Sequence, residues 1–360
     1  MPRWAQLSIL PALNLLAALL VTGLVTWLIG ENPVECLKLL IHGAFGYGEG
    51  IGYTLFYTTG YIFAGLAVAT AFHAGLFNIG GEGQTYLAGL GVTLVMLGFD
   101  HTLPPAALVP LAILAAMGFG AAWAYIPAYL QAKRGSHIVV TTIMFNFIAY
   151  SLMLYLISHQ LIEPGSQNPT TREFAESGWI PQLHVLAAGM GLELPSSPLN
   201  LTFVLALIAS ALFYLVVWHS RWGFTLRTVG TNEHAARYAG VSVSRVIIVA
   251  MCVSGALGGL SAVNDLLGSS HRMNVLFTNG VGFVGIAVAL MGRNHPVGII
   301  LSALLFGALT QGGSDLSFEK PMITREMILF IQGLIILFCG ALENLFEPFI
   351  AGLFKRKDNK

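Results

Sequence analysis

The chain has 360 residues, of which 56% are hydrophobic and only 9% are charged, and its 17 basic and 17 acidic residues cancel to a net charge of zero. Soluble domains carry about 25% charged residues, so this composition is typical of a protein that crosses a membrane. A net charge of zero excludes a global basic field for nucleic acid. No polar stretch is long enough for a separate soluble domain, so we expect residues 1–360 to form one transmembrane domain.

The apolar runs predict an all-α, polytopic fold with about ten transmembrane helices, because each run is near the roughly 20 residues that a bilayer requires. The predicted spans are 7–29, 52–73, 80–99, 104–130, 137–157, 200–218, 245–267, 281–291, 297–312 and 323–346. The first span is longer than the core of a signal peptide, so we expect it to stay in the protein. The eighth is too short to cross alone and follows the polar run 277–282, which predicts a broken or re-entrant element.

The most informative segment is 72–84, which places an Asn, a Glu, a Gln and four glycines between two apolar runs. Non-helical backbone and polar side chains survive at membrane depth only where protein buries them or a watery cavity meets them. The segment therefore favours a transport path over an anchor. The alternative is a tight cytosolic turn, with Glu82 near a helix N-terminus where the macrodipole favours a carboxylate.

Basic residues predict the orientation of the chain, because cytoplasmic loops of membrane proteins carry an excess of Lys and Arg. With the N-terminus inside, the inner loops and tails hold Arg3, Lys133, Arg134, Arg221, Arg227, Arg237, Arg245, Arg293, Lys355, Arg356, Lys357 and Lys360. The outer side holds only Lys38, Arg172, Arg272, Lys320 and Arg325. This asymmetry predicts that both termini are cytosolic.

Two hydrophilic stretches lie between the spans. The outer one, 158–199, is interpreted as an external lid or docking surface, or as an ordinary loop with a short helix on the membrane face. The inner one, 219–245, contains a predicted two-turn helix that Thr231 or Asn232 caps and that ends at Gly240. Two turns are not stable alone in water, so this helix must dock on a partner, on its own protein or on lipid.

Catalytic signatures are absent: the sequence has no Walker A loop, no His-Glu-x-x-His, no Gly-x-Ser-x-Gly and no Cys pair. We therefore expect no catalytic residue, no metal site and no ATPase site in this chain. Asp265 follows Asn264 inside an apolar run, so it is either a functional intramembrane acid or a solvated acid at the outer helix end. The spacing of Gly255 and Gly259 on the same run predicts close helix packing.

Four motifs, in order, give the chain a family resemblance. They are Phe77–Gln84, Ile138–Asn146, Gly223–Gly240 and Gly282–Gly298. They resemble the signatures of the membrane permeases of bacterial ABC importers for nucleosides and simple sugars, a ribose-permease-like group related to branched-chain amino acid permeases. One departure is Asn264-Asp265, where that group has an apolar residue followed by Glu.

The resemblance implies a permease subunit in the bacterial cytoplasmic (inner) membrane that moves nucleosides, or simple sugars, inward by alternating access. Its implied partners are ABC ATPase subunits that hold ATP-Mg, a second permease subunit, identical or paralogous, an external substrate-binding protein and the lipid bilayer. The chain itself would bind no cofactor and no nucleic acid. A different class of function, an ion-coupled secondary transporter that uses Glu82 or Asp265, is the alternative.

The resemblance also suggests two groups of site residues. The candidate path-lining residues are polar and mostly uncharged: Asn78, Glu82, Gln84, Thr141, Thr142, Asn146, Asn264 and Asp265. The candidate ATPase-coupling residues lie in 219–245: Arg227, Asn232, Glu233, Ala235, Ala236, Arg237 and Gly240. Amides and hydroxyls exchange hydrogen bonds with a neutral, hydroxyl-rich solute without presenting net charge.

Overall fold

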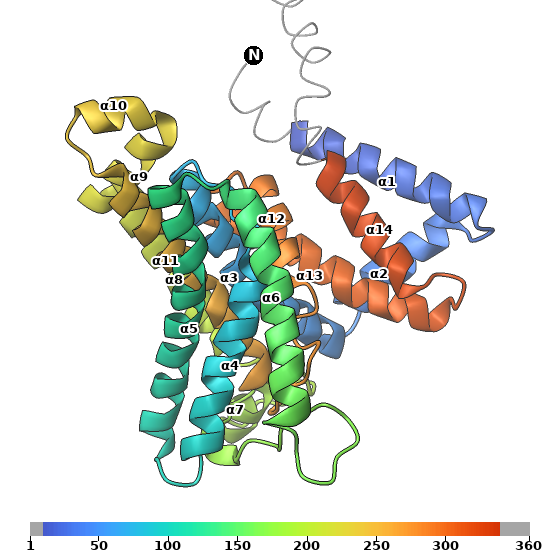
Figure 1. The fold of residues 1–360 in the computed structure, drawn as a ribbon. Coiled ribbons are helices and arrows are strands. Elements are labelled where there is room, and N and C mark those ends of the chain that lie inside the picture. Colours follow the sequence, from blue (N-terminus) through green and yellow to red (C-terminus); the bar gives the residue numbers. More distant parts are fainter. Residues whose placement is uncertain (1–9, 339–360) are drawn as a thin grey trace, which may run out of the picture. The chain divides into compact units, whose positions relative to one another are not determined.

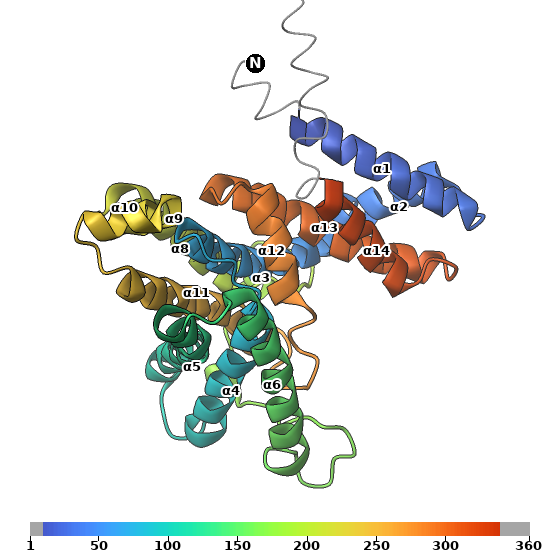
Figure 2. The same ribbon diagram turned by 45° about the horizontal axis from the view of Figure 1, so that its top comes forward.

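A computed structural model describes residues 10–338, and every regular element in that range is a helix, apart from two isolated β-bridges. The contacts divide the chain into two compact units, residues 1–54 with 308–360, and residues 55–307. Figure 1 shows the helices in chain order, and Figure 2 shows them after a rotation of 45°. The two terminal segments, with Arg3, Cys339 and the basic residues from Lys355 onward, lie outside the described residues.

The first unit contains α1 (Leu10–Leu28), α2 (Pro33–Phe45), α14 (Arg325–Ile336) and the unit's shares of α3 (Gly48–His73) and α13 (Pro296–Glu319). The apolar helices α1 and α2 bend by 117° at the break between them. Gly30 turns there with a φ of 98°, and the Asn32 side chain caps α2 by accepting from the N–H groups of Val34 and Glu35. None of the predicted spans includes α2.

Polar contacts in the first unit gather around Asp315 and around Lys320. The Tyr47 hydroxyl donates to Asp315 Oδ2 at 2.5 Å, and this acceptor raises the pKa of Tyr47 to about 12. The Gln311 amide donates to the other oxygen of Asp315 at 3.1 Å. Lys320 lies 3.3 Å from carboxylate oxygens of both Glu31 and Glu35.

The second unit contains the remaining helices, most of α3 and half of α13. In chain order these helices are α4 (Gly81–Phe99), α5 (Pro105–Arg134), α6 (Ile138–His159), the short 3-10 helix η2 (Glu176–Gly178), α7 (Leu183–Gly189), α8 (Thr202–His219), α9 (Arg221–Thr231), α10 (Glu233–Tyr238), α11 (Val243–Leu266) and α12 (Val281–Met291). Within this unit, α10 and α7 lie at opposite ends (Figure 1). We name these the α10 end and the α7 end.

Helix α11 forms the centre of the second unit and packs against α4 and α5. A Cβ atom at Gly255 would lie 2.7 Å from the Ala124 Cβ, and one at Gly259 would lie 2.6 Å from the Ala116 carbonyl oxygen. The glycine spacing therefore lets the backbones of α5 and α11 touch, as the sequence predicts.

Six described helices are long and apolar enough to cross a membrane, and a bent pair makes a seventh candidate. The six are α3, α5, α6, α8, α11 and α13. The most apolar windows of α5, α6 and α8 are at most a third buried by the chain itself, whereas that of α3 is 83% buried. The chain therefore covers most of α3 and leaves apolar surface exposed on the other three helices. The described residues thus support a polytopic membrane protein with six or seven candidate spans. The predicted total of ten and the cytosolic termini stay predictions, and the end of span 323–346 lies outside the described residues.

Candidate functional site

The non-helical stretch 74–80 between α3 and α4 is largely buried in the second unit, and side-chain amides bind the backbone of its last two residues. Asn78 is 1% exposed and its Oδ1 accepts from the Gly80 N–H at 2.8 Å. The Asn78 Nδ2 donates to Ser254 Oγ of α11 at 2.9 Å and to Gln84 Oε1 at 3.2 Å. Buried main chain without helical partners needs such acceptors and donors, so Asn78 fixes the break to α11.

Asn146 of α6 holds the same stretch from the other side. Its Oδ1 accepts from the Gly83 N–H at 2.9 Å, and its Nδ2 donates to the Ile79 carbonyl at 2.8 Å. The amide thus replaces two main-chain partners that a continuous helix would have supplied. The structure brings Asn78 of the break, Gln84 of α4 and Asn146 of α6 together around one turn of backbone.

Glu82, in the first turn of α4, is 7% exposed, and its carboxylate binds the start of α12. Oε1 accepts from the Thr278 hydroxyl at 2.5 Å and from the Gly280 N–H at 3.2 Å, while Oε2 accepts from the Gly282 N–H at 2.9 Å. A carboxylate near free N–H groups at a helix N-terminus is stabilised by the helix dipole. The predicted helix N-terminus is therefore present, but the amides that bind Glu82 belong to α12.

The approach of these two helices depends on Gly282. A Cβ atom there would lie 2.5 Å from the Gly81 carbonyl carbon and 2.6 Å from the Glu82 Cα, which no side chain can occupy. The start of α4 and the start of α12 therefore meet backbone to backbone, and Glu82 lies at the meeting point. We name Glu82, Thr278, Gly280 and Gly282 the Glu82 junction.

Of the other candidate path residues, Thr142 lies against the break, because a Cβ atom at Gly80 would be 3.1 Å from the Thr142 Cβ. Thr141 and Thr142 both donate to carbonyls of the preceding turn, at 3.0 Å to His137 and 2.8 Å to Ile138. Asn264 accepts from Thr202 at 2.5 Å and donates to the Phe56 carbonyl at 3.2 Å, so it joins α8, α11 and α3. Asp265 lies in the last turn of α11, at the α7 end, and accepts from Ser270 at 2.8 Å.

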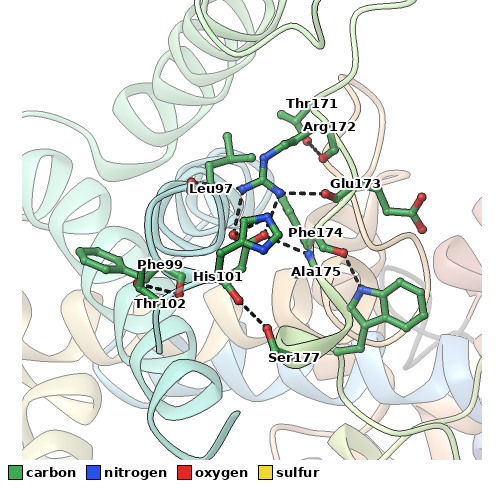
Figure 3. Close-up of polar contacts among 12 residues, drawn as sticks. Leu97, Phe99, His101, Thr102, Thr171, Arg172, Glu173, Phe174, Ala175 and Ser177 are labelled. Atoms are coloured by element: carbon green, nitrogen blue, oxygen red, sulfur yellow. Dashed lines mark hydrogen bonds and ion pairs between the residues drawn. The ribbon is translucent and has the colours of Figure 1, made fainter. Parts of the chain in front are cut away.

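A second buried carboxylate, Asp100, follows the last residue of α4. Arg172 donates to both of its oxygens, at 2.7 and 2.9 Å, and the Ala175 N–H donates to one of them at 3.0 Å; Arg172 and Ala175 are labelled in Figure 3. Burial by itself would raise the pKa of Asp100, but the Arg172 guanidinium and the Ala175 N–H outweigh burial and hold that pKa below its ordinary value. We name the pair of Asp100 and Arg172 the Asp100 latch.

The latch holds residues 170–182, part of the predicted external loop, at the C-terminal end of α4, and the same residues are hydrogen-bonded to the α11–α12 connection. Thr171 N–H donates to Met273 O at 3.0 Å, and Phe174 N–H donates to His271 O at 2.7 Å. The Trp179 ring stacks on the His271 ring with their centroids 3.8 Å apart. Residues 170–182 therefore connect the end of α4 to the chain segment that leads to the Glu82 junction.

The helix predicted in 219–245 is present as α10, and a further helix, α9, precedes it. The Asn232 side chain caps α10 by accepting from the Ala235 N–H at 2.9 Å, and Gly240 follows the helix with a φ of 81°. Both features match the sequence prediction. Arg237 pairs with Glu233 at 2.5 Å, one turn apart on the exposed surface.

The exposed side of α9 and α10 is hollowed. A groove of about 390 Å³ is lined by Phe224, Arg227, Thr228, Thr231, Asn232 and Ala235. Ala235 is exposed, whereas Ala236 is fully buried in a cluster with Leu226 and Val229 of α9. The side chain of Ala236 therefore packs within the chain, which corrects its inclusion in the coupling surface.

The far end of α9 touches the break after α3 without any side chain between them. A Cβ atom at Gly75, where φ is 74°, would lie 3.2 Å from the Gly230 Cα, and one at Gly230 would lie 2.9 Å from the Gly75 nitrogen. Both positions therefore require glycine. The α9–α10 segment thus contacts the chain three residues before Asn78.

Comparison with known proteins decides the family. Residues 50–340 match the model of the branched-chain amino acid transport system / permease component family. This chain belongs to that family. It is 35% identical to the guanosine ABC transporter permease protein NupP of Bacillus subtilis, over 97% of each chain. It is 34% identical to the glucose ABC transporter permease protein TsgB13 of Haloferax volcanii, over 99% of this chain and 93% of that one. The nucleoside ABC transporter permease protein NupB of Lactococcus lactis is 30% identical, over 92% of this chain and 90% of that one.

The family defines the role of the chain. It is the permease subunit of an ABC importer and an integral protein of the cytoplasmic membrane, and this role is transport and not catalysis. ABC permeases work with ATPase subunits and a substrate-binding protein. The family assignment does not favour the alternative of an ion-coupled secondary transporter.

Sequence reasoning missed the partners of the predicted residues. Ser254, Thr278, Gly280 and Gly282 all bind path candidates but are not among them. The signal was present, since the sequence predicted a break at 277–282. The sequence did not indicate that this break lies against the break at 74–80.

Proposed function

We propose that this permease imports nucleosides, with simple sugars as the second candidate, by alternating access driven by separate ATPase subunits. Relatives named for guanosine, nucleosides and glucose support a neutral, hydroxyl-bearing cargo. The buried side chains around the two breaks agree with such a cargo, because they are amides, hydroxyls and one carboxylate: Asn78, Gln84, Asn146, Ser254, Thr278 and Glu82. A phosphorylated cargo would favour Arg at the site.

The observation that carries the mechanism is the meeting of two broken segments at the Glu82 junction. Carrier sites form where interrupted helices meet inside a membrane protein. Asn78 and Asn146 hold one interruption, and Glu82 joins it to the other. We propose that these residues shape the translocation path by fixing its backbone, while Gln84, Thr141, Thr142, Asn264 and Asp265 support the surrounding helices.

The partner surfaces follow from the two ends of the second unit. In the proposal, both termini and the α9–α10 segment are cytosolic, and the ATPase binds at the exposed groove with Arg227, Asn232, Glu233, Ala235, Arg237 and Gly240 near it. ATP-Mg is held by the ATPase, and this chain hydrolyses none. A second permease, identical or paralogous, completes the pore, and the substrate-binding protein delivers cargo to the α7 end.

The ATPase surface is tested by placing a charge on each face of α10. Ala235→Glu adds a charge at an exposed position, so it should abolish co-purification of the ATPase while the permease inserts normally. Ala236→Glu buries the charge in the chain's own core, so it should lower the amount of folded permease. Ala106→Glu, an exposed alanine in the first turn of α5 at the other end, is the matched control. Wild-type co-purification with Ala235→Glu would contradict the proposed surface.

The cargo is tested by competition uptake in cells that carry the full transport system. Unlabelled nucleosides should inhibit uptake of a labelled nucleoside more strongly than free sugars do. Inhibition by sugars alone would reverse the ranking, and inhibition by nucleotides alone would contradict the argument from charge. Uptake by the purified chain on an ion gradient without an ATPase would overturn the proposal as a whole.

A further inference from the structure

An apolar hairpin at the α7 end has no role in the proposed transport mechanism. It comprises α7 and the following residues, 183–197, and we name it the apolar hairpin. Val185, Met190, Leu192 and Leu194 are between 54% and 72% exposed. Glu193 is its one charged residue. Several large apolar side chains exposed within one short segment indicate a candidate site of interaction.

The base of the hairpin is closed by hydrogen bonds, so its position is fixed. Leu183 N–H donates to the Leu199 carbonyl at 2.7 Å, and His184 Nδ1 accepts from the Ser197 N–H at 3.4 Å. Gln182 forms an isolated antiparallel bridge with Asn200 and donates to the Gly268 carbonyl at 3.3 Å. The hairpin is therefore an ordered projection whose apolar tip does not fold back onto the chain.

The base also lies where a membrane span begins. Asn200 donates through its side chain to Asn264 in the last turns of α11, and α8 starts at Thr202. The first turns of α8 expose Leu201, Val204 and Ile208 at 39%, 44% and 50%. These side chains lie at the start of a candidate span of which the chain buries only a third, so we expect them to meet lipid.

Distances then place the tip of the hairpin. A helix of seven residues, the length of α7, is about 10 Å long. The interfacial layer of a bilayer is roughly 5–8 Å thick on each side of the hydrocarbon core. A projection of this length that starts at the first turn of a span lies within or next to that layer.

We propose that the apolar hairpin inserts Val185, Met190, Leu192 and Leu194 into the interfacial region of the bilayer and anchors the α7 end to the membrane surface. The residue types fit this partner, because interfacial segments bury an apolar face about 5–10 Å below the surface. The hairpin lacks Lys and Arg, so binding depends on apolar insertion and not on anionic lipid. A soluble protein partner is the competing occupant.

The test uses the full chain in phosphatidylcholine vesicles, with its three cysteines replaced by alanine. An environment-sensitive NBD label at Met190→Cys should show blue-shifted emission. It should lose intensity to phospholipids spin-labelled near the carbonyl group and resist aqueous iodide. The same label at Gln167→Cys, an exposed position in the polar part of the same loop, should respond in the opposite way.

A second label at Leu192→Cys protects the test against local disturbance at Met190. Quenching by iodide and not by lipid at both positions would overturn the proposal. Iodide quenching that disappears only when the substrate-binding protein is added would also overturn it and would assign the hairpin to that protein. An equal response in vesicles with and without anionic lipid is expected, and a strict need for anionic lipid would contradict insertion by apolar side chains.

Discussion

Each end of α4 carries a buried carboxylate, and the two carboxylates are held in opposite ways. Glu82 at the start accepts only from neutral donors, a hydroxyl and two backbone N–H groups. Asp100 at the end accepts from a guanidinium, whose side chain is 34% exposed, and from one backbone N–H. The difference follows from access to water. Arg172 pairs with Asp100 and its side chain still reaches water, whereas a cation at the Glu82 junction would be enclosed by protein.

The comparison distinguishes a contact that can rearrange, at Glu82, from one that is rigid, at Asp100. A bidentate Arg–carboxylate pair is rigid in geometry and strong. The Glu82 carboxylate also accepts charge-assisted bonds, but they come from three separate neutral donors at a helix start, which can exchange acceptors when that helix moves. We therefore expect changes at Glu82 to affect transport and changes at Asp100 to affect stability.

The largest effect is expected from Glu82→Ala. It leaves the Thr278 hydroxyl and two N–H groups of the α12 start without an acceptor, and each buried unsatisfied group costs about 1–3 kcal/mol. We expect the α12 start to move during transport, so part of this cost should enter the transport barrier, where about 1.4 kcal/mol is tenfold in rate; uptake per inserted molecule should therefore fall about tenfold. The measurement is uptake normalised to inserted protein.

Thr278→Val serves as the matched control, because it removes one donor and leaves both backbone N–H groups on the carboxylate. Its uptake should lie between that of the wild type and that of Glu82→Ala. Uptake per molecule that stays at the wild-type level in Glu82→Ala would show that Glu82 has no part in transport.

A smaller effect on transport and a clear effect on stability are expected from Asp100→Asn. The change removes the charge that binds Arg172, and hydrogen bonds to charged groups contribute about 1.5–3 kcal/mol. Thermal unfolding in detergent should shift to lower temperature. Arg272→Gln is the control, since its pair with Glu173 is exposed on both sides and such pairs contribute about 0–1 kcal/mol. Equal shifts for the two variants would remove the distinction between the latch and a surface pair.

The latch also predicts a pH dependence. The pKa of Asp100 is below its ordinary value in the folded chain, so its contribution is present above the unfolded pKa of about 3.9 and is lost as pH falls through the lower folded value. The difference in unfolding temperature between wild type and Asp100→Asn should be constant from neutral pH to about pH 5 and should shrink below about pH 4. A difference that grows on acidification would have the wrong sign for an ion pair.

The smallest effect is expected from Thr141→Ala. Its hydroxyl donates to a carbonyl of its own helix and the residue is partly exposed, so the change should stay within about 0.5 kcal/mol. Asn146→Ala, one turn deeper, removes two backbone contacts and should lower uptake per molecule. Equal uptake for the two variants would argue that the Asn146 amide does not support the path.

The sequence predicted local features better than pairings. The cap by Asn232, the left-handed Gly240 and the helix at 281–291 are as predicted, because each depends on a few adjacent residues. The family assignment was also predicted, since the four motifs are local patterns that occur in order. In contrast, α2 and α9 were missed, because neither has the length or hydropathy of a span.

The site could be predicted only in part for a related reason. Side-chain type indicates that Asn78, Glu82 and Asn146 need buried partners, and the structure gives them such partners. Which atoms serve as partners depends on how two breaks 200 residues apart in the chain meet, as Glu82 and Gly282 do. Ala236 shows the same limit, because a small residue suits a contact with a partner and a contact within the chain equally well.

The contact between Gly230 and Gly75 has a mechanical meaning. Side chains deform through rotamer changes, so a contact made through them absorbs part of any displacement. Here a Cβ atom at Gly75 would lie 3.2 Å from the Gly230 Cα, so the two main chains touch with no side chain between them. We therefore expect a displacement of α9 to move the break before Asn78 directly, without loss to side-chain rotation.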